Sequence, residues 1–331
     1  MRSRIESTET AGAVQLAGYL TLLVTPAALL ATAIGASSAH SSATIGFGVA
    51  VVLVGSVSVV SERGRLFETE RSARTGTQQD VGTVFAVVLG AVCTYLLSVA
   101  GGFGPVLASA VVGVGVGIAV PRMDSQVYCG SFVGMVSPAV IPSLEYLVVA
   151  GLIAGGVFVA TDEVFGGVGG KLGTIALCGC ASIVALTGLE YGAGGAPAWE
   201  FAALVVPVAV AGAVVTLLVS VHLGFGAVVG SGVVGVGASV VFPLASSEPA
   251  VGTMLAAVAF CASFVGMSSV TRLEMRHVAL AGGLCGLVYL VTMPAFDGAG
   301  GKLGTVAFIA CLAMIGATEL ETHIRTRLAR D

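Results

Sequence analysis

The stretch Gly169-Gly170-Lys171-Leu172-Gly173-Thr174 returns 131 residues later as Gly300-Gly301-Lys302-Leu303-Gly304-Thr305. A second stretch, Ser131-Phe132-Val133-Gly134-Met135, returns 132 residues later as Ser263-Phe264-Val265-Gly266-Met267. Because these matches keep the same order along the chain, they indicate one structural unit that is present twice. The unit covers about 81–190 and 200–321, with a small insertion in the second copy.

The composition predicts that this unit lies in a membrane. Of the 331 residues, 56% are hydrophobic and only 10% are charged, and the mean hydropathy is +1.03. A soluble domain needs about a quarter of its residues charged to cover its surface. The 48 glycines would let helix backbones approach closely in lipid. We therefore expect an all-α polytopic membrane protein, with the lipid bilayer as its main partner and no nucleic acid.

Apolar runs long enough to cross a bilayer recur along the whole chain. One of them is short and carries Pro138 and Pro142, which indicates a broken or re-entrant helix. About twelve helical segments are predicted, at 11–35, 43–60, 81–100, 103–121, 126–142, 144–161, 172–190, 200–221, 224–243, 250–270, 277–294 and 303–319.

These segments divide the chain into five parts. Residues 1–80 form two N-terminal transmembrane helices and a charged cytoplasmic loop, because the first apolar run is too long for an ordinary signal peptide. The first repeat, 81–190, is joined by the connecting loop 191–199 to the second repeat, 200–321. Residues 322–331 form a cytoplasmic tail.

The arginines predict how the two copies face the membrane, since cytoplasmic loops hold the positive charge. With a cytoplasmic N-terminus and twelve spans, every arginine is cytoplasmic. Arg122 has no basic counterpart in 244–249, and Arg272 has none in 139–145. This reversal favours inverted copies, in a multi-pass protein of the cell membrane with both termini cytoplasmic. Parallel copies with re-entrant 131–135 and 263–267 segments are the alternative.

The first candidate site contains the only two lysines of the chain, Lys171 and Lys302. Each opens a predicted helix after two glycines, and the free N–H groups at a helix start favour anions. The predicted solute-binding residues here are Lys171, Lys302, Gly169, Gly170, Gly300, Gly301, Thr174 and Thr305. The alternative is that the glycines cap the previous span and the lysines reach the headgroups.

The second candidate site is the other repeated motif. Ser131 and Ser263, with Gly134 and Gly266, put hydroxyls beside a glycine inside a membrane segment. Such a segment can unwind and line a pathway where it borders a cavity. The alternative is tight helix packing through the glycines.

The sequence shows no catalytic constellation. All seven cysteines lie in apolar runs and form no zinc pattern with histidine, so no metal or cofactor is expected. The architecture is similar in kind to repeat-built transporters and channels. We therefore expect passage of a small solute or ion, with a weak preference for an anionic or polar one, at the interface between repeats. An intramembrane enzyme or an accessory scaffold for lipid or envelope chemistry is the alternative, and a homo-oligomer is left open.

Overall fold

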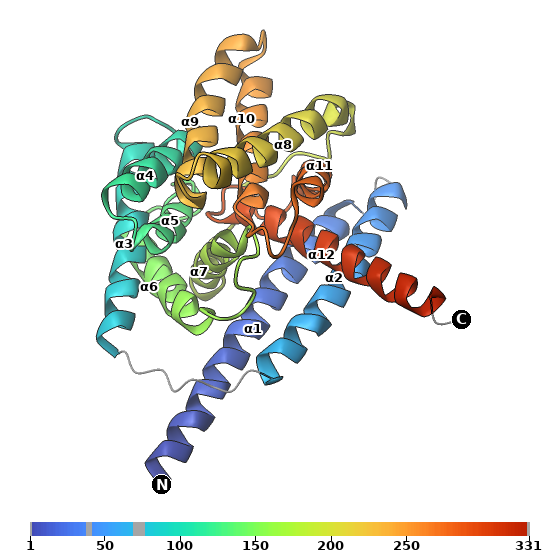
Figure 1. Ribbon diagram of the computed structural model, residues 1–331. Coiled ribbons are helices and arrows are strands. Elements are labelled where there is room, and N and C mark those ends of the chain that lie inside the picture. The colour runs from blue at the N-terminus through green and yellow to red at the C-terminus, as the bar shows by residue number, and fades with distance from the viewer. Residues whose placement is uncertain (1, 38–41, 69–76, 330–331) are drawn as a thin grey trace.

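The computed structural model describes residues 2–37, 42–68 and 77–329, and this part of the chain is helical (Figure 1). Residues 69–76, in the middle of the expected charged loop, and residues 330–331 lie outside the described residues. A 3₁₀ turn, η1 (Trp199–Phe201), precedes α8, and a π-helical turn, η2 (Leu218–His222), follows it. The α-helices are α1 (Arg2–Ser37), α2 (Ser42–Glu68), α3 (Thr77–Val99), α4 (Pro105–Ala119), α5 (Asp124–Val133), α6 (Leu144–Ala160), α7 (Lys171–Thr187), α8 (Ala202–Leu217), α9 (Ala227–Ala245), α10 (Pro249–Gly266), α11 (Met275–Thr292) and α12 (Lys302–Leu328).

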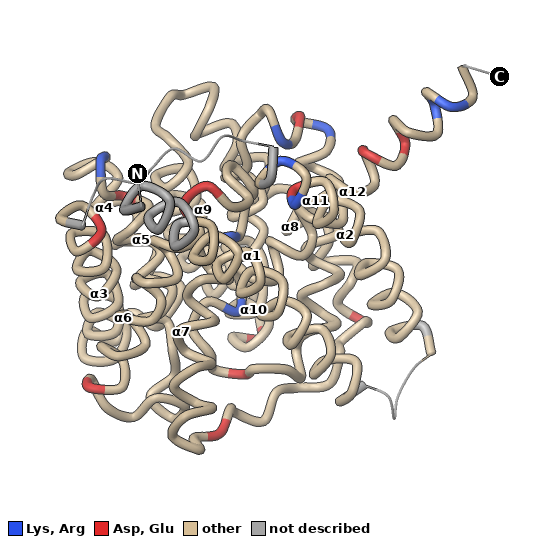
Figure 2. Tube along the Cα trace, turned by 90° about the horizontal axis from the view of Figure 1, so that it is seen from below, with Lys and Arg blue, Asp and Glu red and all other residues tan. Residues whose placement is uncertain are grey.

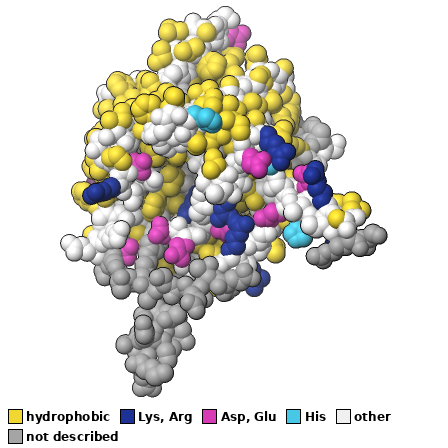
Figure 3. Space-filling model, in the orientation of Figure 1, with side chains coloured by type: hydrophobic (Ala, Val, Ile, Leu, Met, Phe, Trp, Pro, Cys, Tyr) yellow, Lys and Arg dark blue, Asp and Glu magenta, His cyan; other side chains and the backbone are white. Residues whose placement is uncertain are grey.

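Eight of these helices are long and apolar enough to cross a membrane: α1, α2, α3, α8 with its flanking turns, α9, α10, α11 and α12. Shorter apolar helices are α4, α6 and α7. This supports the predicted all-helical, multi-pass membrane protein, although fewer helices reach full spanning length than the twelve expected segments. The face shown in Figure 3 is consistent with a membrane position, because hydrophobic side chains cover most of its upper part and most of its charged side chains lie in the lower part.

The predicted span at 126–142 is broken, as its prolines indicated. Helix α5 has ten residues, so it rises about 15 Å, half of the hydrocarbon core of a bilayer. Residues after Gly134 continue as turns up to the start of α6. In the second half, α10 has 18 residues and ends at Gly266, so the two matched motifs end helices of different length.

The helices of the two halves pack in matching ways. Helix α3 packs against α4, α5 and α6, and α8 packs against α9, α10 and α11. The halves meet where α4 packs against α9 and where α7 packs against α12. The N-terminal helices stand outside this arrangement, with α2 along α12 and α1 against α6 and α7 (Figure 1).

Close approach of α7 and α12 depends on glycine. A Cβ atom on Gly173 would overlap the Cα atom of Gly304, and the reverse holds as well. The residues that precede the two helices, Gly170 and Gly301, have φ values of 82° and 84°, which glycine adopts without strain. The repeated motif therefore brings the first turns of both helices together in the middle of the molecule.

Candidate functional site

Two pockets lie beside this crossing, and each is lined by one of the two lysines. Pocket 1 has a volume of about 340 Å³ and is lined by Lys171, residues 166–170 before it, and Asp124 at the start of α5. Pocket 2 has a volume of about 280 Å³ and is lined by Lys302, residues 297–299 before it, and Pro105 at the start of α4. Each pocket is large enough for a small solute.

Phe132 and Phe264 line both pockets and so lie between them. Their ring centroids are 4.7 Å apart, with the rings tilted by 56°. Tyr128 packs 4.5 Å from Phe132, and Phe260 packs 4.7 Å from Phe264. The four side chains are at most 2% exposed, so they form a closed aromatic barrier between pocket 1 and pocket 2.

The pockets use residues from matching places in the two halves. Leu172 lines pocket 1 and Leu303 lines pocket 2, each directly after the lysine. The beginning of α9, at Ala227, lines pocket 1, whereas the beginning of α4 lines pocket 2. Each pocket therefore combines its own lysine-bearing helix with a helix start from the other half.

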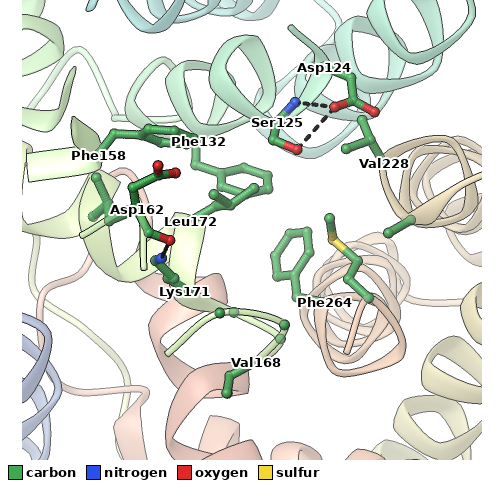
Figure 4. Close-up of a pocket in the computed structure, with 17 residues that line it drawn as sticks. Asp124, Ser125, Phe132, Phe158, Asp162, Val168, Lys171, Leu172, Val228 and Phe264 are labelled. Carbon is green, nitrogen blue, oxygen red and sulfur yellow. Dashed lines mark hydrogen bonds between the residues drawn. The ribbon is translucent and has the colours of Figure 1, made fainter. Parts of the chain in front are cut away.

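Both lysines begin a helix, line a pocket and cap the helix that comes before them, and Figure 4 shows Lys171 with its bond to Asp162. Lys171 Nζ donates to the carbonyl oxygens of Thr161 and of Asp162, the latter at 3.2 Å. Lys302 Nζ donates to the carbonyl oxygen of Met293 at 3.2 Å. These carbonyls end α6 and α11, where a positive charge meets the negative end of the helix dipole. At least one N–H donor of each ammonium group is thus already used by a backbone carbonyl.

The hydroxyl groups of the second motif are used inside the protein. Ser131 and Ser263 are fully buried and do not line either pocket. Ser131 Oγ lies 2.8 Å from Ser109 Oγ, and Ser263 Oγ lies 2.7 Å from Ser231 Oγ. These pairs join α5 to α4 and α10 to α9.

The glycines and threonines of the two motifs divide in the same way. Gly169, Gly170 and Gly301 line the pockets. Gly300 packs against the carbonyl oxygens at the end of α5. Gly134 and Gly266 pack against α3 and α8, so they hold helices together. Thr174 and Thr305 donate to the carbonyls of Gly170 and Gly301, which lie at the start of their own helices.

Sequence reasoning missed two features of this site. The aromatic barrier includes the phenylalanines of the repeated motif, Phe132 and Phe264, to which the sequence analysis gave no role. Glu62 lies in a segment expected to be a solvated linker, yet it is 4% exposed and binds Arg272 at 3.0 Å. Helix α2 extends through this segment to Glu68, well beyond the predicted end of the span.

The loops next to the lysines are held by backbone and aromatic contacts. Gly192 N–H donates to the carbonyl oxygen of Asp297 at 3.0 Å, beside pocket 2. Tyr191 packs on Phe296, and burial raises the pKa of its phenol to about 12, so it remains neutral and packs as a ring.

Acidic and thiol groups are spread through the site without forming a metal centre. In the described part of the chain, no three His, Cys, Asp or Glu residues come together to hold a metal ion. Cys129 donates to the carbonyl oxygen of Leu172 at 3.4 Å, and Cys261 donates to that of Leu303 at 3.0 Å. These thiols help to fix the first turns of α7 and α12.

No family model, no curated protein and no solved structure matches this chain.

Proposed function

We propose that this protein passes a small polar solute across the membrane, between pocket 1 and pocket 2, through the barrier formed by Phe132 and Phe264. The observation that carries the proposal is that the same two rings line both pockets. A solute in either pocket would touch the barrier directly. Displacing these rings would join two pockets of about 340 Å³ and 280 Å³.

The directions of the helices support an inverted relation between the two halves. Helix α5 begins beside pocket 1 at Asp124, and the chain reaches pocket 2 at Met135. Helix α10 runs the other way, from Thr253 in pocket 2 to Met267 in pocket 1. Inverted halves of this kind let transporters present equivalent openings to the two sides of a membrane.

The distribution of charge supports a cytoplasmic position for pocket 1. In Figure 2, most of the blue Lys and Arg residues lie toward the edge of the bundle that carries both termini, two lie near its middle, and red acidic residues lie at both edges. Arg272 Nε donates to the carbonyl oxygen of Gly166, which lines pocket 1. Since cytoplasmic loops hold the positive charge, pocket 1 and both termini would face the cytoplasm.

The contents of the pockets favour an uncharged polar solute over an anion. Pocket 1 is lined by two carboxylate side chains, Asp124 and Asp162, against one lysine. That lysine already donates to backbone carbonyls. A charged solute would also lose its hydration beside four aromatic rings, which is costly unless it is paired.

Solute flux into proteoliposomes tests the proposal. The purified protein would be reconstituted, and swelling after an osmotic step would be followed by light scattering with urea, formamide, glycerol and acetate. We expect uptake of at least one uncharged solute above that of protein-free vesicles. Phe132→Ala and Phe264→Ala should increase the rate and admit larger solutes.

Phe85→Ala is the matched control, because the Phe85 side chain is 66% exposed on α3 and lies outside both pockets. Phe132→Leu provides a milder change if the alanine variants do not fold. Flux equal to that of empty vesicles, or barrier variants that behave like the Phe85 control, would overturn the proposal.

A further inference from the structure

A buried carboxylate joins three separate segments beside pocket 1. Glu62 Oε1 accepts from the backbone N–H of Phe165 at 2.8 Å and from Arg272 Nη2 at 3.3 Å. Glu62 Oε2 accepts from Arg272 Nη1 at 3.0 Å. Arg65 Nη1 lies 3.5 Å from the same oxygen. Thus α2, the segment before α7 and the segment before α11 meet at one side chain.

The bonds continue directly into the wall of pocket 1. Arg272 Nε donates to the carbonyl oxygen of Gly166 at 2.9 Å, and Ser269 N–H donates to that of Gly167 at 2.9 Å. Both glycines line the pocket. Movement of this wall relative to the segment 269–272 requires the bonds to Arg272 and Ser269 to break.

Phe165, directly before the wall residues of pocket 1, has a backbone conformation that a bulky residue rarely adopts. Its φ is 51°, in the left-handed region that a bulky side chain rarely occupies. The ring stacks on Tyr19 at 5.9 Å and meets Phe308 edge-on at 5.4 Å. Such a conformation persists only where the surroundings fix it, and the bond from Phe165 N–H to Glu62 is one of the contacts that do so.

The matching wall of pocket 2 shares some of these contacts and differs in others. Phe296 has a φ of 53°, but it packs on Tyr191 with ring centroids 4.6 Å apart. The backbone N–H of Ser137 donates to the carbonyl oxygen of Gly298 at 2.8 Å, which matches the bond from Ser269 to Gly167. The carbonyl of Asp297 accepts from Gly192. At pocket 2 the Gly192 backbone binds the carbonyl of Asp297, whereas at pocket 1 Arg272, paired with Glu62, binds the matching carbonyl of Gly166, so the two ends of the pathway are not equivalent.

We propose that Glu62 and Arg272 are positioning residues that latch the wall of pocket 1 and make this end the gate of the pathway. The inference rests on the proposed function. This ion pair suits a latch, because without Arg272 the buried Glu62 carboxylate keeps only the exposed Arg65 as a charged partner, which favours a distinct second arrangement over gradual loosening. Helix α2, which lies outside the repeated halves, is then the element that makes a nearly symmetric pathway open from one side.

Cysteine accessibility tests the latch without a known solute. Ser125→Cys places a reporter in pocket 1, and Thr253→Cys places one in pocket 2, both in a Cys93→Ser background that removes the exposed native thiol. Labelling rates with a hydrophilic maleimide would be compared before and after Glu62→Gln and Arg272→Gln. In Glu62→Gln, the side-chain oxygen can still accept from the backbone N–H of Phe165, so this variant should fold.

We expect either latch variant to raise labelling of the pocket 1 reporter about tenfold, which corresponds to the loss of one charge-assisted hydrogen bond. The pocket 2 reporter should change less than about twofold. Arg272→Lys keeps the positive charge but cannot donate two parallel hydrogen bonds to the Glu62 carboxylate. Its labelling rate at the pocket 1 reporter should therefore lie between those of the unchanged protein and of Arg272→Gln. The double variant should add little to either single variant, because both break the same pair.

Arg276→Gln is the matched control, because Arg276 pairs with Glu274 at 3.2 Å on the surface next to the latch, with both side chains more than 60% exposed. It should change neither reporter. Equal increases at both reporters would show general loosening and overturn the latch, as would no change at either. Labelling and flux are separate readouts: absent flux with selective labelling refutes the transport proposal alone, and flux without selective labelling refutes the latch alone.

Discussion

A chain of hydrogen bonds crosses the interface between α5, α9 and α10 and allows a quantitative prediction. Ser263 Oγ donates to the carbonyl oxygen of Phe260 at 2.6 Å, so its hydroxyl accepts from Ser231 at 2.7 Å. Ser231 in turn accepts from the phenol of Tyr128 at 2.9 Å. All of these groups are buried. Ser231 therefore has both a donor and an acceptor role.

The matching chain in the other half is one bond shorter. Ser131 Oγ donates to the carbonyl oxygen of Tyr128 at 2.8 Å and accepts from Ser109 at 2.8 Å. Because the residue that matches Tyr128 is Phe260, no phenol reaches Ser109. The two serines on α4 and α9 thus occupy matched positions with different numbers of bonds.

We expect Ser231→Ala to destabilise the protein by about 2–3 kcal/mol and Ser109→Ala by less than about 1 kcal/mol. The first change removes two bonds and leaves the buried Tyr128 hydroxyl without a partner, which costs about 1–3 kcal/mol. The second removes one bond of the kind that contributes about 0.6 kcal/mol within membranes, and Ser131 keeps its acceptor.

Unfolding of the purified variants in mixed micelles, with increasing SDS, measures the difference. In a Tyr128→Phe background, Ser231→Ala should cost only about 0.6 kcal/mol, because no phenol remains to be orphaned. Equal costs for Ser231→Ala and Ser109→Ala, or additive costs in this double-mutant cycle, would refute the bond directions.

Three further predictions concern packing, capping and lipid exposure. Gly173→Ala should destabilise the crossing of α7 and α12 by about 1–3 kcal/mol in the same assay. Gly156→Ala, where nothing lies within 4 Å of the added Cβ, should not, and equal effects would contradict tight crossing. Lys302→Met should cost about 1–3 kcal/mol through loss of its bond at the end of α11, and an unchanged midpoint would rule out capping. Cys93, exposed on α3, should react in proteoliposomes with a lipophilic maleimide and not with a charged one, and reaction with both would exclude a lipid-facing position.

Repetition in the sequence predicted the parts of the site that occur twice. The GGKLGT motif predicted that Lys171 and Lys302 open helices, and both line pockets. The same reasoning assigned Ser131 and Ser263 to a solute pathway. It could not reveal their partners, because Ser109 and Ser231 stand in apolar runs where a hydroxyl carries no pattern of its own.

The aromatic barrier illustrates a different difficulty. Phe132 and Phe264 belong to matched motifs, but a phenylalanine in a membrane segment can face lipid, neighbouring helices or a pathway. Only the meeting of α5 and α10 brings the two rings within 4.7 Å of each other. Their position between two pockets depends on the fold of both halves, whereas their residue type alone would suit any apolar contact.

Glu62 could not be found from repetition, because it lies outside both copies. Its neighbours Arg63 and Arg65 made the segment look solvated, and burial of a carboxylate at a helix end would be costly without a partner. That partner, Arg272, lies 210 residues further along the chain. The repeated sequence could predict two equivalent pockets. Two equivalent pockets, however, give no reason for a pathway to open at one end and not at the other. In the pathway proposed above, a preferred gate would have to come from a residue that has no counterpart, and Glu62, with its bonds to Phe165 and Arg272 beside pocket 1, meets that condition.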